Sequence, residues 1–357
     1  MGSERTELID AMPFAVGAVE TPAGSVPRVE ARLTARDYLG AWRVRWGIGR
    51  GTYRIPPGLY ALGSPDSSSD VLVTANYKLS FDKLRQALPG RAFWILVLNT
   101  NGVNVWCAAG KGTFGTAELV DRITASNLTD VVSHRRLILP QLGAPGVAAH
   151  DVKKESGFKV IYGPIRSRDI PAFMDAGLKA TDEMRRKTFP VSERMAIIPV
   201  ELVQSLKILI LVMATFFFLS GLGHPYDYWA NTSYSGILAV AATLAAVIGG
   251  TVLVPLLLPW LPGRAFSLKG MWAGLAVVIP LLFWLGNGLA GWPQCLETAA
   301  WLLMVPALSA FLGMNFTGAS TYTSLSGVRK EMRIAVPFQI GAGAVGLILW
   351  FASRFTV

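Results

Sequence analysis

The uneven distribution of charged residues constrains the fold of this chain more than any other feature. From Ile208 to the end there are only six Lys and Arg residues and three Asp and Glu residues, while the first 207 residues hold 27 of the 33 basic and 20 of the 23 acidic ones. A length of 357 residues allows two domains. At 52% hydrophobic residues the chain is too apolar for one ordinary water-soluble domain. The sequence therefore predicts a soluble N-terminal domain followed by an all-α transmembrane domain.

The second half contains five apolar runs that are long enough to cross a bilayer as helices, which takes about 20 residues. These runs are residues 204–223, 235–258, 270–291, 298–316 and 334–352, within a membrane domain of residues 191–357. No ionisable side chain is expected deep in any of them, which argues against an ion-coupled transporter.

Lys and Arg residues occur in every second connection between these runs. The loops after the second and fourth runs contain them, and the loops after the first and third do not. By the positive-inside rule we expect a multi-pass protein of the cytoplasmic (inner) membrane, with its N-terminal domain in the cytosol and its C-terminus outside. Arg354 does not fit this pattern, because it lies at the C-terminal end that is expected outside. The cluster Arg185-Arg186-Lys187 is interpreted as a flank of the first span, because the other basic residues are too dispersed for a nucleic-acid site.

The soluble half is expected to fold as a Rossmann-like α/β domain over residues 31–190. Residues 1–30 are rich in Gly, Pro and small residues, lack the apolar stretch of a cleavable signal peptide, and are expected to be poorly ordered. Strands are predicted at 71–73, 93–98, 137–139 and 158–162, with helices from Ser80, from Thr116 and from Ser167 or Asp169. This alternation implies a parallel sheet covered by helices. Ligands in such sheets bind beyond the carboxyl ends of the strands, so the segment after Leu98 is the candidate site.

Two nucleotide-binding motifs partly resemble this segment. A phosphate loop fails twice, because Val105 stands where its first Gly is required and Gly112 follows Lys111. Gly110, Gly112 and Gly115 satisfy G-x-G-x-x-G, but they lie about ten residues beyond the strand that they should follow directly. A membrane transporter or sensor with a nucleotide-binding domain would depend on this weak match.

Cys107 offers a third interpretation of the segment. It is expected in a loop at the ligand-binding edge, where small residues would let a large flat group approach the backbone. Nearby N–H groups and Lys111 would favour its thiolate. The alternative is a small buried hydrophobe. A disulfide with Cys295, the only other cysteine, is not expected, since the two lie in different halves of the chain.

Residues 104–111, Asn-Val-Trp-Cys-Ala-Ala-Gly-Lys, match without departure the signature of the mercury-methylating corrinoid proteins, the HgcA family. Residues 73–78, 140–147 and 316–337 resemble that family too, as does the order of a soluble domain and five spans. The soluble domain is also similar to the cobamide-binding domain in the large subunit of the corrinoid iron–sulfur protein of acetyl-CoA synthesis. The first 60 residues match neither.

The resemblance implies a base-off cobamide (cobalamin) cofactor whose cobalt is bound from below by Cys107, the catalytic residue and metal ligand. It places the motif on a helix that caps the lower face of the corrin, with Asn104, Val105, Trp106, Ala108, Ala109, Gly110 and Lys111 around the ring and Thr74 nearby. The implied activity is methyl transfer to Hg(II), forming methylmercury. A thiolate donor should favour departure of the methyl as a carbanion equivalent. The Asp-x-His-x-x-Gly signature of histidine-ligated cobalamin proteins is absent around His134, His150 and His224.

Partners follow from the same resemblance. Two separated cysteines cannot hold an iron–sulfur cluster, so no intrinsic cluster is expected, and the implied electron donor is a small ferredoxin with two [4Fe–4S] clusters. The methyl donor would belong to the methyltetrahydrofolate pathway, and the remaining partners are Hg(II) and the lipid bilayer, not nucleic acid. The hydroxyl-rich run 317–327 is expected to face the corrin or the ferredoxin. A methyl carrier for another acceptor is the alternative.

Overall fold

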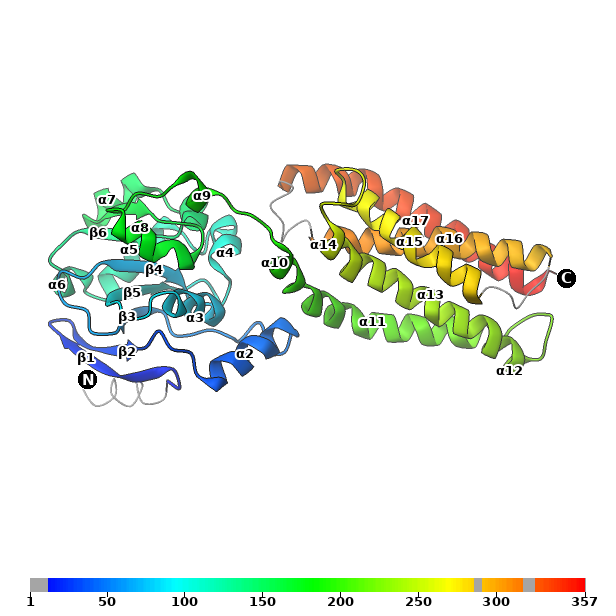
Figure 1. The fold of residues 1–357 in the computed structure, drawn as a ribbon, viewed down its shortest axis with the longest axis horizontal. Coiled ribbons are helices and arrows are strands. Elements are labelled where there is room, and N and C mark those ends of the chain that lie inside the picture. The colour runs from blue at the N-terminus through cyan, green and yellow to red at the C-terminus, as the bar shows by residue number, and fades with distance from the viewer. Residues whose placement is uncertain (1–11, 286–290, 317–324, 357) are drawn as a thin grey trace. The chain divides into compact units, whose positions relative to one another are not determined.

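The chain forms two compact units in the computed structural model, which describes residues 12–285, 291–316 and 325–356. The first unit consists of Met1–Val44 and Ile48–Lys187, and the second of Arg45–Gly47 and Thr188–Val357. The first is an α/β domain and the second is entirely helical among its described residues (Figure 1).

A seven-stranded mixed sheet forms the centre of the α/β domain, with the strand order β1-β2-β3-β5-β4-β6-β7. Its strands are β1 (Ala15–Thr21), β2 (Gly24–Val29), β3 (Gly58–Leu62), β4 (Val71–Ala75), β5 (Phe93–Leu98), β6 (Arg136–Leu139) and β7 (Lys159–Tyr162). The four predicted strands are present as β4 to β7 and run parallel. The prediction of a wholly parallel sheet is wrong, because β3 runs antiparallel to β5 and β1 antiparallel to β2.

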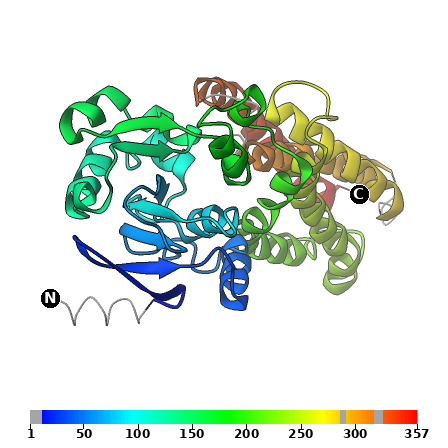
Figure 2. The ribbon, with the colours of Figure 1, turned by 60° about the vertical axis from the view of Figure 1, so that its left-hand side comes forward.

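Residues 15–29 form the β1–β2 hairpin at one edge of the sheet (Figure 2), where the sequence suggested little order. Gly24, at the start of β2, has a positive φ of 105°, which glycine adopts without strain. Val26 and Val29 are buried in the core. The glycine and small residues that suggested disorder therefore serve a tight turn, and Val26 and Val29 enter the cores on opposite faces of the sheet.

Helices cover both faces of this sheet, and the two central strands are buried on both sides. The covering helices are α3 (Lys78–Gln86), α4 (Val105–Lys111), α5 (Thr116–Ala125), α6 (Leu128–Val131), α7 (Ala149–Ser156), α8 (Ile170–Asp175) and α9 (Asp182–Arg185), with 3-10 turns η1 (Gln141–Gly146) and η2 (Ser167–Asp169). Helix α2 (Ala35–Arg45) is joined to α3 by ion pairs of Asp37. Alternate residues of β5 enter opposite cores: Trp94 and Leu96 enter one, Phe93 and Ile95 the other. The continuous apolar run of β5 is thus explained by burial on two faces.

Helix starts were predicted with mixed success. Helix α5 begins at Thr116 as expected. Helix α3 begins two residues before Ser80, with Tyr77 at its N-cap. The earlier start places Lys78 one turn before Asp82, and these two side chains form an ion pair of 2.7 Å. This pair, not a serine cap, accompanies the first turn.

The helical unit contains four helices that are long and apolar enough to cross a membrane, Tyr228–Leu257, Phe266–Leu285, Trp292–Met314 and Ser326–Phe355. They are built from α12 (Tyr228–Asn231), η3 (Thr232–Gly236), α13 (Ile237–Val247), η4 (Ile248–Leu253), α14 (Val254–Leu257), α15 (Phe266–Leu285), α16 (Trp292–Met314) and α17 (Leu325–Phe355). A fifth span exists only if a pair bent by 51°, Val191–Leu206 with Ile208–Leu219, is counted as one; it comprises α10 (Val191–Met195) and α11 (Ile198–Leu219). The first predicted run, residues 204–223, thus becomes a longer, bent segment.

Small residues hold α15 and α16 close together. A Cβ added to Gly270 would lie 2.6 Å from the Ser309 carbonyl oxygen, and one added to Gly274 would lie 2.6 Å from Cα of Pro306. The Ser309 hydroxyl donates to the Gly270 carbonyl at 2.8 Å. Close backbone approach through small residues is typical of helices packed within a membrane.

Ionisable side chains are buried at the ends of these helices. Arg194 donates to the carbonyls of Pro255 and Leu256 within α14, and Lys269 donates to those of Leu258 and Leu261 just beyond it, so both cations satisfy carbonyls at the end of this helix. Arg354, the discordant charge, lies 2.8 Å from Glu297.

Candidate functional site

The candidate segment lies beyond the carboxyl ends of β4 and β5 (Figure 1), as the parallel arrangement of these strands predicted. Residues 99–104 leave β5 and lead directly into α4. Cys107 lies within α4, not in a loop as the residues alone had suggested.

A buried amide fixes the path of this loop. Asn76 follows β4 and is 2% exposed. Its Oδ1 accepts hydrogen bonds from the backbone N–H of Thr100 at 3.1 Å, the backbone N–H of Gly102 at 2.9 Å and the Thr100 hydroxyl at 2.9 Å. Asn101 and Gly102 both have positive φ, 55° and 73°. One side chain therefore satisfies the backbone of a tight turn that would otherwise bury unpaired donors.

Asn104 begins α4. Its side-chain Oδ1 accepts from the backbone N–H of Cys107 at 3.0 Å, and its own backbone is extended. This is an N-cap, which stabilises a helix by about 1 kcal/mol relative to alanine. The helix ends at Gly112, which is left-handed with φ 81°. Because the cap bonds to the backbone of Cys107, it fixes the position of that residue without engaging its thiol.

Glycines on the facing turn determine how α4 is oriented. Ala108 and Ala109 are buried, and α4 packs against η1. A Cβ added to Gly146 would lie 3.1 Å from Cα of Ala109 and would collide with the carbonyl oxygen of Phe114, while one added to Gly143 would lie 2.5 Å from the Phe114 ring. Only glycine lets the two backbones approach this closely.

The opposite face of α4 is open. Cys107, Gly110 and Lys111 are exposed, and a Cβ added to Gly110 or Gly112 would meet no atom within 4 Å. Asn104, Val105 and Trp106 are half-buried, whereas Ala108 and Ala109 pack into the core, so Cys107, Gly110 and Lys111 are the members of the eight-residue run that are exposed on the open face. Thr74 is different: it is 4% exposed, within β4, and paired with Val97 of β5. The structure does not place its side chain on the exposed face of Cys107.

The G-x-G-x-x-G glycines do not form a dinucleotide fingerprint. Gly110 lies in the last turn of α4, Gly112 ends that helix, and Gly115 is the N-cap of α5. A fingerprint needs its first glycine in the turn directly after the strand. Here the whole of α4 lies between β5 and α5. The three glycines therefore have the spacing of the fingerprint but not its strand–turn–helix context.

The donor set suits a metal that brings most of its own ligands. Within the parts of the chain that the structure describes, no group of three or more His, Cys, Asp and Glu side chains could hold a metal ion. Cys107 is a free and exposed thiol, so the site offers one soft donor on an open surface of small residues. A metal held in a flat macrocycle needs one axial ligand of this kind and room to approach the helix, and the residues present fit such a group.

Asn76 was not singled out as functional from the sequence, although it lies in one of the runs that carry the resemblance. We predict that Asn76→Ala leaves the N–H groups of Thr100 and Gly102 without an acceptor, at about 1–3 kcal/mol for each buried donor. Hydrogen exchange of residues 99–111, measured by mass spectrometry on the full chain, should accelerate strongly. Asn76→Asp keeps an acceptor oxygen and should have a smaller effect. Unchanged exchange in Asn76→Ala would show that the loop holds its shape without the amide.

Comparison with known proteins places this site in a recognisable segment. Residues 50–174 match the family described as CO dehydrogenase/acetyl-CoA synthase delta subunit. Among curated proteins, the chain is similar to acetyl-CoA decarbonylase/synthase complex subunit gamma of Methanopyrus kandleri, with 32% identity over 123 residues, and of Archaeoglobus fulgidus, with 31% over 124 residues. Each match covers 34% of this chain and 26% of the relative, so the chain spans about a quarter of the length of these proteins. Over residues 50–174, which include β3 to β7 and the whole of α4 with Cys107, the α/β domain is therefore similar to the CO dehydrogenase/acetyl-CoA synthase delta subunit family.

Proposed function

We propose that this chain is a membrane-attached corrinoid protein that transfers a methyl group to Hg(II) and forms methylmercury. The observation that carries the proposal is the exposed thiol of Cys107 on α4, at the carboxyl edge of the sheet. It lies within the segment that is similar to the CO dehydrogenase/acetyl-CoA synthase delta subunit family and to acetyl-CoA decarbonylase/synthase complex subunit gamma. The eight-residue run around it, which resembles the mercury-methylating family, provides the reason for naming Hg(II) as the acceptor.

The residues of α4 have distinct tasks in this proposal. Cys107 would hold the cobalt of a cobamide through its thiolate, and the Asn104 cap would keep Cys107 in position. Gly110 leaves space for the macrocycle to approach the backbone. When bound, the corrinoid would supply the methyl group that is transferred. A thiolate is a strong donor that raises electron density on the metal, and Hg(II) accepts a methyl group together with its bonding pair.

A methyl carrier for another acceptor is the second candidate. The relatives that match residues 50–174 are subunits of acetyl-CoA decarbonylase/synthase complexes by name, and that name contains no mercury chemistry. The two candidates share the corrinoid and Cys107 and differ only in what receives the methyl group.

A single-turnover experiment distinguishes the two. We expect the purified full chain, loaded with methylcobalamin and mixed with Hg(II), to give up to one methylmercury per cobalt, together with a visible spectrum that differs from free cobalamin. Free methylcobalamin at the same concentration is the control. A shifted spectrum without methylmercury above this control would favour the carrier, and an unshifted spectrum would refute corrinoid binding through Cys107.

Repeated turnover requires a reductant and a methyl donor. With two cysteines in different halves of the chain, Cys107 and Cys295, we propose that electrons come from a small ferredoxin with two [4Fe–4S] clusters, and methyl groups from the methyltetrahydrofolate pathway. In the same assay, reduced ferredoxin and a methyl donor together should raise the yield above one product per cobalt. The hydroxyl-rich run proposed to face the corrin or ferredoxin lies mostly at 317–324, outside the described residues.

The proposed location is the cytoplasmic membrane, with the α/β domain in the cytosol and the C-terminus outside. Four or five candidate spans are compatible with this location, and the alternation of Lys and Arg along the loops supports the orientation. We predict that a reporter fused after Val357 is active outside, and that one inserted at Gly263 is active inside. Activity of both reporters on one side would contradict a five-span topology.

A further inference from the structure

Helix α2 presents its large apolar residues outward. Asp37 and Val44 are buried, while Tyr38, Leu39 and Trp42 are 57%, 58% and 56% exposed. At about 100° per residue, the three exposed side chains centre on the side of the helix opposite Asp37 and Val44. An ordinary surface helix of a soluble domain has the reverse pattern, with its apolar stripe toward the core.

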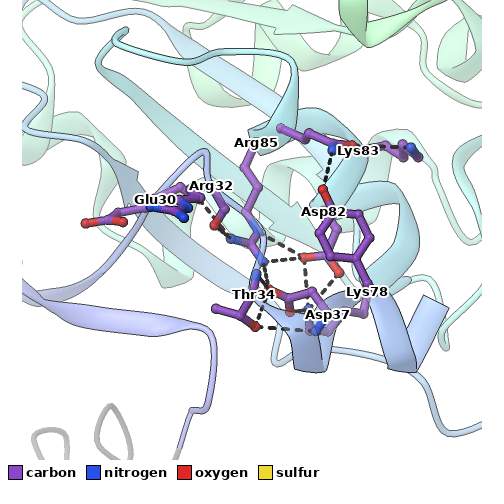
Figure 3. Close-up of polar contacts among 10 residues, drawn as sticks. Glu30, Arg32, Thr34, Asp37, Lys78, Asp82, Lys83 and Arg85 are labelled. Atoms are coloured by element: carbon purple, nitrogen blue, oxygen red, sulfur yellow. Dashed lines mark hydrogen bonds and ion pairs between the residues drawn. The ribbon is translucent and has the colours of Figure 1, made fainter. Parts of the chain in front are cut away.

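Buried ion pairs hold α2 in this orientation (Figure 3). Asp37 lies 2.6 Å from Lys78 and 2.8 Å from Arg85, and both cations also pair with Asp82. Asp37 further accepts from the backbone N–H of Thr34 at 2.9 Å. Rotating the helix to bury its aromatic face would separate Asp37 from Lys78 and Arg85 and leave a buried charge unpaired, which is costly.

Arginines flank the exposed apolar stripe. By the same helical geometry Arg36 and Arg43 lie on one side of it and Arg45 on the other, and all three are exposed. Beyond the helix, Ile48 is 48% exposed and Arg50 is also exposed. A helix with Trp, Tyr and Leu on one face and basic residues beside them is typical of segments that lie in the plane of a membrane interface.

We propose that α2 binds the surface of a bilayer containing anionic lipids, with Tyr38, Leu39 and Trp42 inserted at the headgroup level and the arginines on lipid phosphates. The positive charge of Arg36, Arg43 and Arg45 beside the apolar stripe is complementary to anionic headgroups. The chain itself contains helices able to cross a membrane, and these helices would tether the α/β domain to a bilayer. Aromatic rings of this kind are enriched at the membrane–water interface. The proposal is independent of the corrinoid and of the methyl acceptor.

A fluorophore on α2 tests this in the full chain. Leu39→Cys is labelled in a Cys107→Ser/Cys295→Ser background and reconstituted in vesicles of phosphatidylcholine with phosphatidylglycerol. His150→Cys in α7 is the matched label, because its side chain is 86% exposed and α7 lies at the far end of the same domain from α2 (Figures 1 and 2). We expect lipids carrying a nitroxide near the headgroup to quench the label at position 39 and not the label at 150, while aqueous iodide does the opposite.

Two further variants define the contact. Arg36→Gln/Arg43→Gln should reduce lipid quenching at position 39, as should vesicles of phosphatidylcholine alone, because both remove the electrostatic attraction. Tyr38→Ser/Trp42→Ser should lower lipid quenching at position 39 to the level seen at position 150, while Asp37 keeps its partners. If the label at 39 is as open to iodide as the one at 150, α2 faces water and the proposal fails. If it is shielded from both iodide and lipid nitroxides, a protein surface covers α2, and the proposal fails as well.

Discussion

Cys107→Ala is expected to reduce methyl transfer to Hg(II) to the background of free methylcobalamin. The change removes only an exposed thiol, and the Asn104 side chain accepts its hydrogen bond from the backbone N–H of residue 107, so the sulfur takes no part in it. The fold of α4 should therefore persist, and the lost activity should reflect the missing thiol and not unfolding. The measurements are methylmercury formed per cobalt and the visible spectrum of the loaded protein, with circular dichroism as the check of folding.

Two companion variants sharpen this prediction. Cys295→Ala removes the other free and exposed cysteine, and should leave both activity and spectrum unchanged. Cys107→His offers imidazole, also a good metal ligand, so a corrinoid could remain bound while weaker donation slows methyl departure. Full activity in Cys107→Ala, or equal damage from Cys295→Ala, would show that the chemistry has been assigned to the wrong sulfur.

The second large effect is expected for the stability of the α/β domain. Asp37→Asn removes one charge from the buried network with Lys78, Asp82 and Arg85, and removing one partner of a buried pair costs about 3–5 kcal/mol. Hydrogen exchange in α2 and α3 should accelerate in the full chain. Asp175→Asn is the matched control, since its 2.7 Å pair with Arg91 is largely exposed and should contribute less than about 1 kcal/mol. Similar effects of the two changes would contradict the special role of the buried network.

The same network gives the domain a defined response to acid. Burial raises the pKa of Asp37, but hydrogen bonds from Lys78, Thr34 and Arg85 and the charge of Lys78 outweigh it and hold the pKa well below its ordinary value. A carboxyl whose pKa is depressed by folding contributes stability that is complete above its unfolded pKa of about 3.9 and is lost as the pH falls below that value. The wild-type domain should therefore lose stability below about pH 4, and Asp37→Asn should flatten this dependence. Acid titration followed by near-ultraviolet circular dichroism checks both.

The sequence predicted best where burial dictates the pattern. Phe93 to Leu98 is apolar at every position because both faces of β5 are covered, and this is visible without a structure. Strand β3 was missed: it is short, begins with Gly58, and shows no alternation. Its antiparallel pairing with β5 joins residues about 35 positions apart, such as Tyr60 and Ile95, and no local signal reports such a contact. The sheet was therefore predicted as parallel and is mixed.

In the candidate site, too, local features could be predicted from the sequence and long-range contacts could not. The exposure of Cys107 and the small residues of α4 could be anticipated from the motif. The role of Asn76 could not, because its partners Thr100 and Gly102 lie about 25 residues further along the chain and meet it only through the adjacency of β4 and β5. The close approach of Gly146 to Ala109 depends likewise on folding. Spacing identifies a motif, whereas the residues that position it are found by long-range contacts.

Arg354 has an electrical consequence in a membrane under voltage. A lone charge carried across the field experiences about 2.3 kcal/mol for each 100 mV. Glu297 lies 2.8 Å away and both side chains are buried, so this end of α16 and α17 carries a local dipole with almost no net charge. In the proposed orientation the membrane potential would exert little force on it. Glu297→Gln would unbalance the pair and make the packing of these two helices sensitive to voltage.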